Sequence, residues 1–274
     1  MTYQGIDTMA RITAAQAQAM RENDISFICR YLGPASWGKT ITRQEAYTLL
    51  QAGISILLCY ETSADRMRGG AAAGEIDGLN ARNYAQDLGL PAGTAIFFAC
   101  DYNVPDRDLI LCESYIRNAQ AALGGIYEAG AYGPERLVSF LSERGACEKF
   151  WQCVAWSNMF LPAANVRQYQ WQGGPEARAM AAKLGFAVDL DAAEDLRGLW
   201  HPEEKEESHW YDEAMQWADE AGIMQDGRPN DYVTRAEAAT MFMREDERIQ
   251  KMIVETVKAM QPEDDKRYGG LISE

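Results

Sequence analysis

Carboxyl side chains stand directly after four apolar runs in the first two hundred residues of the chain. These residues are Asp7, Glu61, Asp101 and Asp189. Carboxyl groups that converge at one opening can cleave a glycosidic bond, because one donates a proton to the leaving sugar oxygen while another stabilises the developing charge. We therefore predict catalytic roles for all four. Asp191 is a candidate for substrate contact, with capping of the turn that follows it as the alternative.

Asp101 is the leading candidate among these acids. It follows an almost wholly apolar run, where partial loss of solvent would raise its pKa toward the working range of an acid. Capping of a loop or helix at the same point is the alternative. Asp7 is its predicted electrostatic partner. Glu61 is a second candidate for the proton donor, with an ion pair to Arg66 or Arg30 as the alternative.

Aromatic residues gather near the ends of the same apolar runs. They are Tyr31, Tyr60, Tyr102, Tyr132, Trp156, Tyr169 and Trp171. Aromatic rings stack on the apolar faces of sugars while their polar edges meet hydroxyl groups. Each residue alone is more often part of a core, but the group favours a carbohydrate site. We predict substrate-binding roles for all of its members except Trp156.

Alternating strands and helices must position these side chains. Eight apolar runs bounded by turn residues are predicted as buried parallel strands. Their ranges are 3–7, 26–32, 54–61, 94–101, 125–132, 150–156, 166–171 and 186–190. Helical patterns separate most of them, and Thr42 with Glu45 forms a capping-box pattern at the start of one helix. This order predicts an α/β fold, a short (β/α)8 TIM-like barrel with its site at the carboxyl ends of the strands. A doubly wound sheet is the rival, but no glycine-rich phosphate loop follows the first run.

The composition narrows the classes of partner and the place of action. A net charge of −15 argues against binding to nucleic acids and to anionic membranes. The six cysteines and two histidines show no metal-binding spacing, so we expect neither a metal nor another cofactor.

No apolar run reaches the length of a membrane span, and no leader sequence is visible at the start. We expect synthesis in the cytoplasm without a signal peptide and action at the cell wall after release, or as part of a phage-like particle.

Five short motifs carry a resemblance over the first two hundred residues. They are 5–7 (Gly-Ile-Asp), 99–103 (Ala-Cys-Asp-Tyr-Asn), 130–133 (Gly-Ala-Tyr-Gly), 168–171 (Gln-Tyr-Gln-Trp) and 188–191 (Val-Asp-Leu-Asp). The segment resembles the glycoside-hydrolase-like domain of unknown function found in bacterial and phage proteins, which is similar to the family-25 lysozymes. One departure matters: those lysozymes carry Asp-x-Glu where this chain has Asp101-Tyr102-Asn103. An amide cannot donate the proton that the leaving sugar oxygen needs.

The resemblance implies a lysozyme-like, endolysin-type hydrolase directed at cell-wall glycan. In the predicted mechanism, Asp101 acts with Asp7 and Glu61 on a β-linked amino sugar, whose own acetamido group attacks the anomeric carbon. The alternative is a catalytically inactive protein that binds glycan or assembles into a particle on a hydrolase-like barrel.

The remainder of the chain has a different composition. We predict a barrel domain over residues 1–200, an acidic linker over 201–207, a helix-loop-helix unit over 208–244, and a charged helix with a tail over 245–274.

The helix-loop-helix unit resembles an S-layer homology repeat. Trp210-Tyr211 opens its first helix, and Thr234-Arg235-Ala236-Glu237 caps its second. The resemblance implies binding of secondary wall polysaccharide through Trp210, Arg235 and Glu237. Such repeats usually work as three copies, so a single copy implies a homotrimer. A small helical packing or oligomerisation element is the alternative.

Overall fold

The computed structural model describes residues 2–202 and residue 251. The chain divides into a first unit, residues 1–204, and a second unit, residues 205–274. Most of the predicted linker, the segment that resembles an S-layer homology repeat, and the charged tail therefore lie outside the described residues, as do Trp210, Arg235 and Glu237. Within the part of the chain that is described, no helix is both long and apolar enough to span a membrane.

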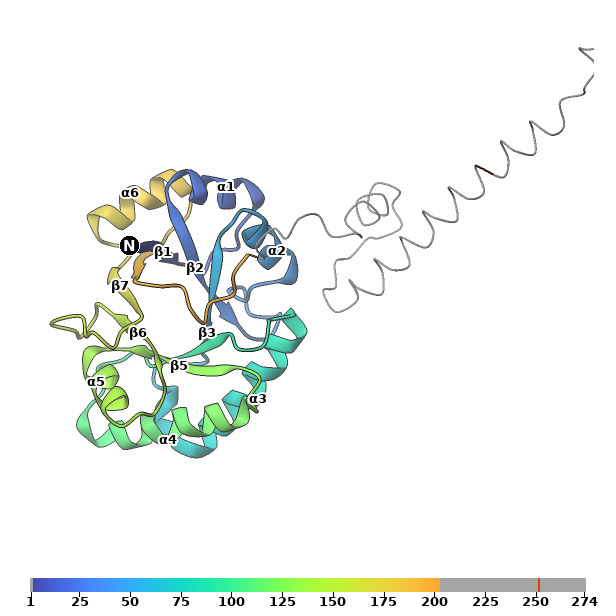
Figure 1. The fold of residues 1–274 in the computed structure, drawn as a ribbon. Coiled ribbons are helices and arrows are strands. Elements are labelled where there is room, and N and C mark those ends of the chain that lie inside the picture. The colour runs from blue at the N-terminus through green and yellow to red at the C-terminus, as the bar shows by residue number, and fades with distance from the viewer. Residues whose placement is uncertain (1, 203–250, 252–274) are drawn as a thin grey trace, which may run out of the picture. The chain divides into compact units, whose positions relative to one another are not determined.

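Eight strands close a barrel in chain order (Figure 1). The strands are β1 (Tyr3–Asp7), β2 (Ile25–Leu32), β3 (Ser55–Tyr60), β4 (Ala95–Ala99), β5 (Glu128–Gly133), β6 (Lys149–Cys153), β7 (Val166–Gln170) and β8 (Asp189–Ala193). The helices around them are α1 (Ala14–Glu22), α2 (Arg43–Gln51), η1 (Arg66–Gly69), α3 (Gly70–Leu88), α4 (Asp106–Ala122), α5 (Glu135–Glu143) and α6 (Pro175–Leu184). The predicted TIM-like barrel is thus confirmed. No helix lies between β6 and β7.

The last strand corrects one detail of that prediction. β8 begins at Asp189, later than expected, and runs antiparallel to both β1 and β7. An apolar run predicts a strand but does not encode its direction. Asp7 and Asp189 are partners in the β1–β8 pairing, as are Tyr3 and Ala193. β8 therefore enters at the mouth of the barrel, where β1 ends, and runs toward the floor.

Side-chain alternation along the strands separates two cores. One lies between the barrel and its helices, and the other fills the barrel interior. Inside, the Phe27 ring lies against Gly5, where a Cβ atom would come within 2.3 Å of it. Phe97 lies against Gly130 in the same way, at 2.8 Å. The rings fill the lower barrel, and the open space is left at the mouth.

A buried ion pair fixes the wall of the barrel below the mouth. Arg30 on β2 donates to Glu45 at 2.8 Å, and both side chains are almost completely buried. Glu45 also accepts the backbone N–H of Ile12, and Arg30 donates to the carbonyl oxygen of Thr8. Thr42 caps α2 as predicted, accepting the N–H of Glu45. The Glu45 carboxylate, however, joins the buried pair, which ties the β1–α1 loop to β2.

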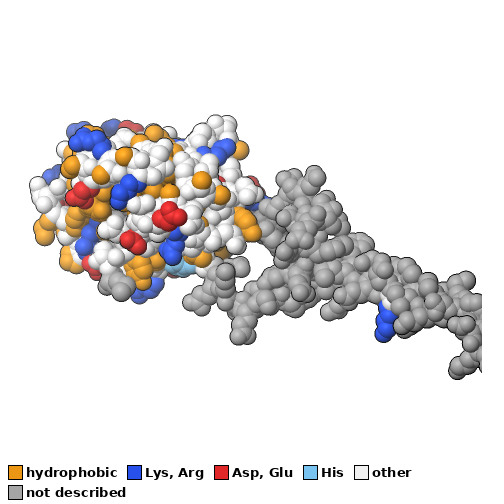
Figure 2. Space-filling model, turned by 90° about the horizontal axis from the view of Figure 1, so that it is seen from above, with side chains coloured by type: hydrophobic (Ala, Val, Ile, Leu, Met, Phe, Trp, Pro, Cys, Tyr) orange, Lys and Arg blue, Asp and Glu red, His pale blue; other side chains and the backbone are white. Residues whose placement is uncertain are grey.

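Charged side chains of both signs are interspersed over the face of the barrel drawn in Figure 2. No gathering of lysine and arginine is visible on that face.

Candidate active site

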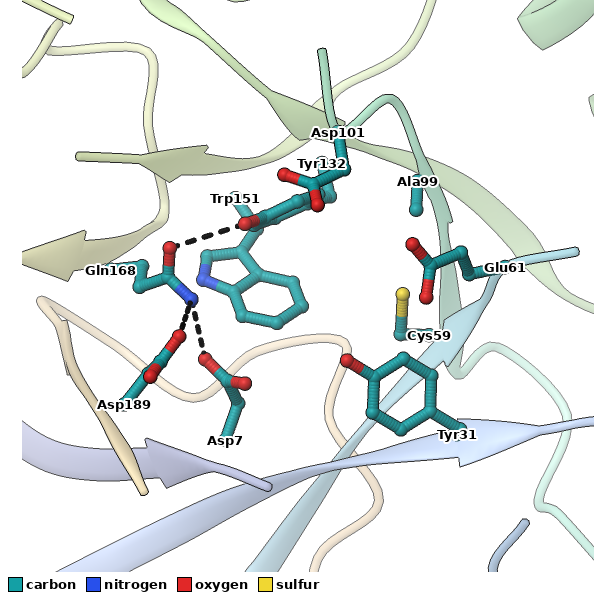
Figure 3. Close-up of a pocket in the computed structure, with 10 residues that line it drawn as sticks. All are labelled: Asp7, Tyr31, Cys59, Glu61, Ala99, Asp101, Tyr132, Trp151, Gln168 and Asp189. Carbon is teal, nitrogen blue, oxygen red and sulfur yellow. Dashed lines mark hydrogen bonds between the residues drawn. The ribbon is translucent and has the colours of Figure 1, made fainter. Parts of the chain in front are cut away.

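A pocket opens at the mouth of the barrel (Figure 3). Its lining residues are Asp7, Tyr31, Cys59, Glu61, Ala99, Asp101, Tyr132, Trp151, Gln168 and Asp189. All eight strands contribute, most of them at or just past the end that faces the mouth, while Trp151 and Gln168 lie within β6 and β7. The structure therefore brings together the four carboxyl groups for which the sequence predicts catalytic roles.

Gln168 holds two of these carboxyl groups side by side. Its amide Nε2 donates to Asp7 Oδ2 at 2.6 Å and to Asp189 Oδ2 at 2.9 Å. Its Oε1 accepts the Tyr132 hydroxyl at 3.1 Å, which orients the amide (Figure 3). Asp189 also accepts the backbone N–H of Gln172 at 2.6 Å. The two acids are thus fixed on one side of the pocket by neutral donors, with no cation between them.

Burial makes these carboxyl groups hold their protons more tightly than usual. Burial, followed by the charge of Asp189, raises the pKa of Asp7 to about 7. Burial also raises the pKa of Asp189. The pKa of Asp101 is raised by partial burial and by the nearby charge of Glu61, and Lys39 opposes that rise. Near neutral pH the pocket therefore contains carboxyl groups that can donate protons as well as groups that can carry charge.

Asp191 lies one pleat below Asp7 and is wholly buried. Its Oδ1 accepts the indole N–H of Trp151 at 2.8 Å, and its Oδ2 has no hydrogen-bond partner among the described residues. Burial and the charge of Asp7 hold its pKa well above the ordinary value. Asp191 therefore supports the floor of the pocket through Trp151, and it is not among the residues that line the pocket.

Two members of the predicted aromatic group, Tyr31 and Tyr132, line the pocket. Four other residues with predicted substrate-binding roles are not among the lining residues: Tyr60, Tyr102, Tyr169 and Trp171. Tyr60 follows Cys59 on the strand, so it points to the opposite side and packs on Phe98 in the outer core.

The other three lie elsewhere for different reasons. Tyr102 donates to Asp108 at 3.2 Å, Tyr169 packs against the outer core, and Trp171 is exposed outside the pocket. Four lining residues were not predicted: Cys59, Ala99, Trp151 and Gln168. All four lie on predicted strands, and the alternation of inward and outward side chains was the pattern that could have identified them.

Glu61 is engaged in an ion pair. Lys39 Nζ donates to its Oε2 at 2.6 Å and lies 4.1 Å from the centre of the Tyr31 ring. The alternative reading of Glu61 was therefore right about an ion pair but wrong about the partner, because Arg30 binds Glu45 and Arg66 binds Asp77. A carboxylate that accepts from an ammonium group is poorly placed to donate a proton. Asp101, whose side chain is exposed at the mouth, is better placed.

Replacing Gln168 by methionine is expected to lower the free energy of unfolding by roughly 1–3 kcal/mol at neutral pH. The variant keeps the length of the side chain but leaves the Tyr132 hydroxyl and two carboxyl groups without their amide partner. Urea unfolding measures the change. Gln172→Met is the matched control, because the Gln172 side chain is exposed. Equal stability of both variants would contradict this role for the amide.

No group of three or more histidine, cysteine, aspartate or glutamate side chains within residues 2–202 is arranged to hold a metal ion. All six cysteines are free, and five of them are buried.

A family model described as the Rv2525c-like, glycoside hydrolase-like domain matches residues 18–193. The solved structure of the Tat-secreted protein Rv2525c of Mycobacterium tuberculosis, in complex with L-tartrate, is similar with a TM-score of 0.59 and 22% identity, covering 73% of this chain and 98% of that one. An uncharacterized protein of B. stearothermophilus is similar with a TM-score of 0.54 and 20% identity, covering 72% of this chain and 99% of that one. Both likenesses concern the fold.

Among curated proteins, the uncharacterized protein FadG of Bacillus subtilis is 27% identical over 154 residues, which are 51% of this chain and 26% of FadG. The chain thus spans about a quarter of the length of that relative.

Proposed function

Because the chain belongs to the Rv2525c-like, glycoside hydrolase-like domain family, we propose that its barrel hydrolyses a β-linked amino-sugar glycan of the bacterial cell wall. One observation carries the proposal: Asp7, Asp101 and Asp189, all with raised pKa values, converge on a single pocket between aromatic side chains. Carboxyl groups of this kind can divide the roles of proton donor and charge stabiliser within one site.

Asp101 is the proposed proton donor. Its carboxyl group lies at the mouth, where a leaving sugar oxygen can reach it, and its raised pKa favours the protonated form that can donate. As the acetamido oxygen of the sugar bonds to the anomeric carbon, the glycosidic bond breaks and the leaving oxygen takes the proton of Asp101. Water then attacks the anomeric carbon, the bond between that carbon and the acetamido oxygen breaks, and the proton lost by the water returns to Asp101. Asp7 and Asp189, bridged by Gln168, orient the acetamido group and balance its positive charge.

Lys39 tunes this acid in the proposed mechanism. Its charge lowers the pKa of Asp101, so Lys39→Met is expected to raise that pKa. Since the reaction needs protonated Asp101, the alkaline limb of the profile of kcat/KM against pH should move to higher pH. Lys183→Met, at an exposed position on α6, is the control. An alkaline limb that stays in place, or that moves to lower pH, would contradict the role of Lys39.

Two observations favour a second candidate, a protein that binds wall glycan without cutting it. Asn103 stands where the similar lysozymes carry their acid, and Glu61 is held by Lys39. Release of reducing ends from purified peptidoglycan separates the candidates. Release by the native protein that is lost in Asp101→Asn supports hydrolysis. Sedimentation of the protein with walls, without any release, supports binding alone.

The cell wall is the proposed place of action. The similar protein of Mycobacterium tuberculosis is described as Tat-secreted, which supports a role outside the cytoplasm. We also propose that residues 208–244 bind secondary wall polysaccharide as a homotrimer, which the resemblance to S-layer homology repeats supports. Light scattering of the full chain tests the trimer.

A further inference from the structure

Two tryptophans are exposed on neighbouring loops at the mouth of the barrel. Trp156 follows β6 and is 48% exposed, and Trp171 follows β7 and is 61% exposed. The same two strands supply Trp151 and Gln168 to the pocket. The loop that carries Trp156 projects from the barrel between β6 and β7 (Figure 1). We call Trp156 and Trp171 the tryptophan rim. Neither ring lines the pocket, and Trp171 is followed by Gln172, whose N–H donates to Asp189.

The turn that carries Trp171 is built around its indole ring. A Cβ atom on Gly173 would come within 2.0 Å of that ring, so the indole lies directly on the glycine backbone. The N–H of Gly174 donates to the carbonyl oxygen of Trp171 at 2.8 Å and closes the turn. Inside the same turn, the N–H of Gln172 donates to Asp189 at 2.6 Å. One short segment therefore positions both an exposed aromatic ring and an acid of the pocket.

The loop that carries Trp156 holds its tryptophan in a strained conformation. The φ angle of Trp156 is +55°, in the left-handed region, which is unfavourable for a residue with a side chain. The Ser157 hydroxyl donates to the carbonyl oxygen of Cys153 at 2.7 Å and accepts the N–H of Glu135 at 3.0 Å. Glu135 in turn accepts the N–H of Asn158 at 2.6 Å. These bonds keep the strained residue in place, although the loop contains no helix.

We propose that the tryptophan rim binds the part of a glycan chain that extends beyond the pocket, so that the protein selects long glycans over short ones. Flat indole rings stack on the apolar faces of neutral sugars. The continuity of the rim with the pocket, through the turn that binds Asp189, favours a chain that occupies both. A net charge of −15 disfavours an anionic lipid surface as the occupant. The inference rests on the proposed function in one respect: it takes the ligand to be a glycan.

The test measures binding by calorimetry in the Asp101→Asn variant, which prevents turnover. The probes are N-acetylglucosamine oligomers of two and of six sugars. The longer oligomer is expected to bind more tightly, and Trp156→Ala or Trp171→Ala should each weaken its binding by roughly 3- to 10-fold, the loss of one aromatic contact. Binding of the shorter oligomer should not change. The longer oligomer should also shift the tryptophan fluorescence, and each substitution should reduce that shift. Tyr47→Ala, at an exposed aromatic residue on α2, is the matched control.

Three results would overturn the proposal: no binding of the longer oligomer, equal affinity for both lengths, or affinity for the longer one that survives both tryptophan substitutions. Binding of phosphatidylcholine vesicles through the rim, in place of the oligomer, would also overturn it. Failure of the proposed hydrolysis gives a different pattern. The native protein would release no reducing ends from peptidoglycan, while binding of the longer oligomer would still depend on the two tryptophans.

Discussion

Replacing Asp101 by asparagine is expected to slow glycan cleavage by roughly 10²- to 10⁴-fold, the usual contribution of a positioned acid. The substitution keeps the size of the side chain and removes only its ability to give up a proton to the leaving oxygen. The carboxyl group is exposed at the mouth and makes no hydrogen bond to another residue in the described part of the chain. The rate of release of reducing ends from purified peptidoglycan measures the effect.

The fold should survive this change, which makes the result interpretable. We expect the urea midpoint of the Asp101→Asn variant to equal that of the native protein. Asp87→Asn is the matched control, since Asp87 is an exposed carboxylate near the end of α3. It should leave both the rate and the midpoint unchanged. Full activity in the Asp101→Asn variant would remove Asp101 from the mechanism and leave the pair of Asp7 and Asp189 as the source of the proton.

Replacing Asp7 by asparagine is expected to stabilise the protein at pH 8, by up to roughly 4 kcal/mol. The folded protein holds the Asp7 proton with a pKa of about 7, against 3.8 for an unperturbed aspartate. The stability that this proton contributes is complete below about pH 4, declines as pH rises, and is lost above about pH 7. Each unit of pKa shift corresponds to roughly 1.4 kcal/mol. An asparagine at this position can still accept the Gln168 amide, and it has no proton to lose.

Urea unfolding of both proteins between pH 4 and pH 8 tests this prediction. The two curves should lie close together at pH 4 and separate as pH rises. Asp189, Asp191 and Asp101 also have raised pKa values and contribute to the slope of both curves. Because the charge of Asp7 raises the pKa of Asp191, the difference between the curves reports Asp7 together with its coupling to Asp191. A constant difference across the range would mean that Asp7 titrates as it does in the unfolded chain.

The alternation of strands and helices was predictable, because it depends on local pattern. The range predicted for the first strand agrees with β1 at both ends, and the helix predicted to begin after Thr42 is α2. The convergence of Asp7, Glu61 and Asp101 follows from the same pattern, since parallel strands of a barrel end at one face. Local periodicity thus predicts which strand ends meet.

Other features depended on distant partners, and the sequence does not encode those locally. The direction of β8 depends on which end of the barrel the chain has reached when it leaves α6. The chain enters β8 at the mouth, so Asp189 lies at the mouth although it begins its strand. Successive side chains of a strand point to opposite sides, so a shift of one residue along β3 would decide whether Tyr60 faces the pocket or the outer core. The partner of Glu61 depends on how the loop after β2 folds back, which brings Lys39 over Tyr31.

The pairing of Tyr3 with Ala193 has a consequence for how such a barrel can be inserted into other proteins. Because β8 runs toward the floor, it ends there beside the start of β1, on the face opposite the mouth. After β8 the chain crosses this floor, where Trp200 pairs with Ile56 and His201 meets Ser55 at the start of β3. Both connections of the barrel therefore leave from the floor, and the barrel can be inserted into a loop of another protein. Its pocket then faces away from both junctions, and the same reasoning makes the floor the place to attach a tag or a solid support.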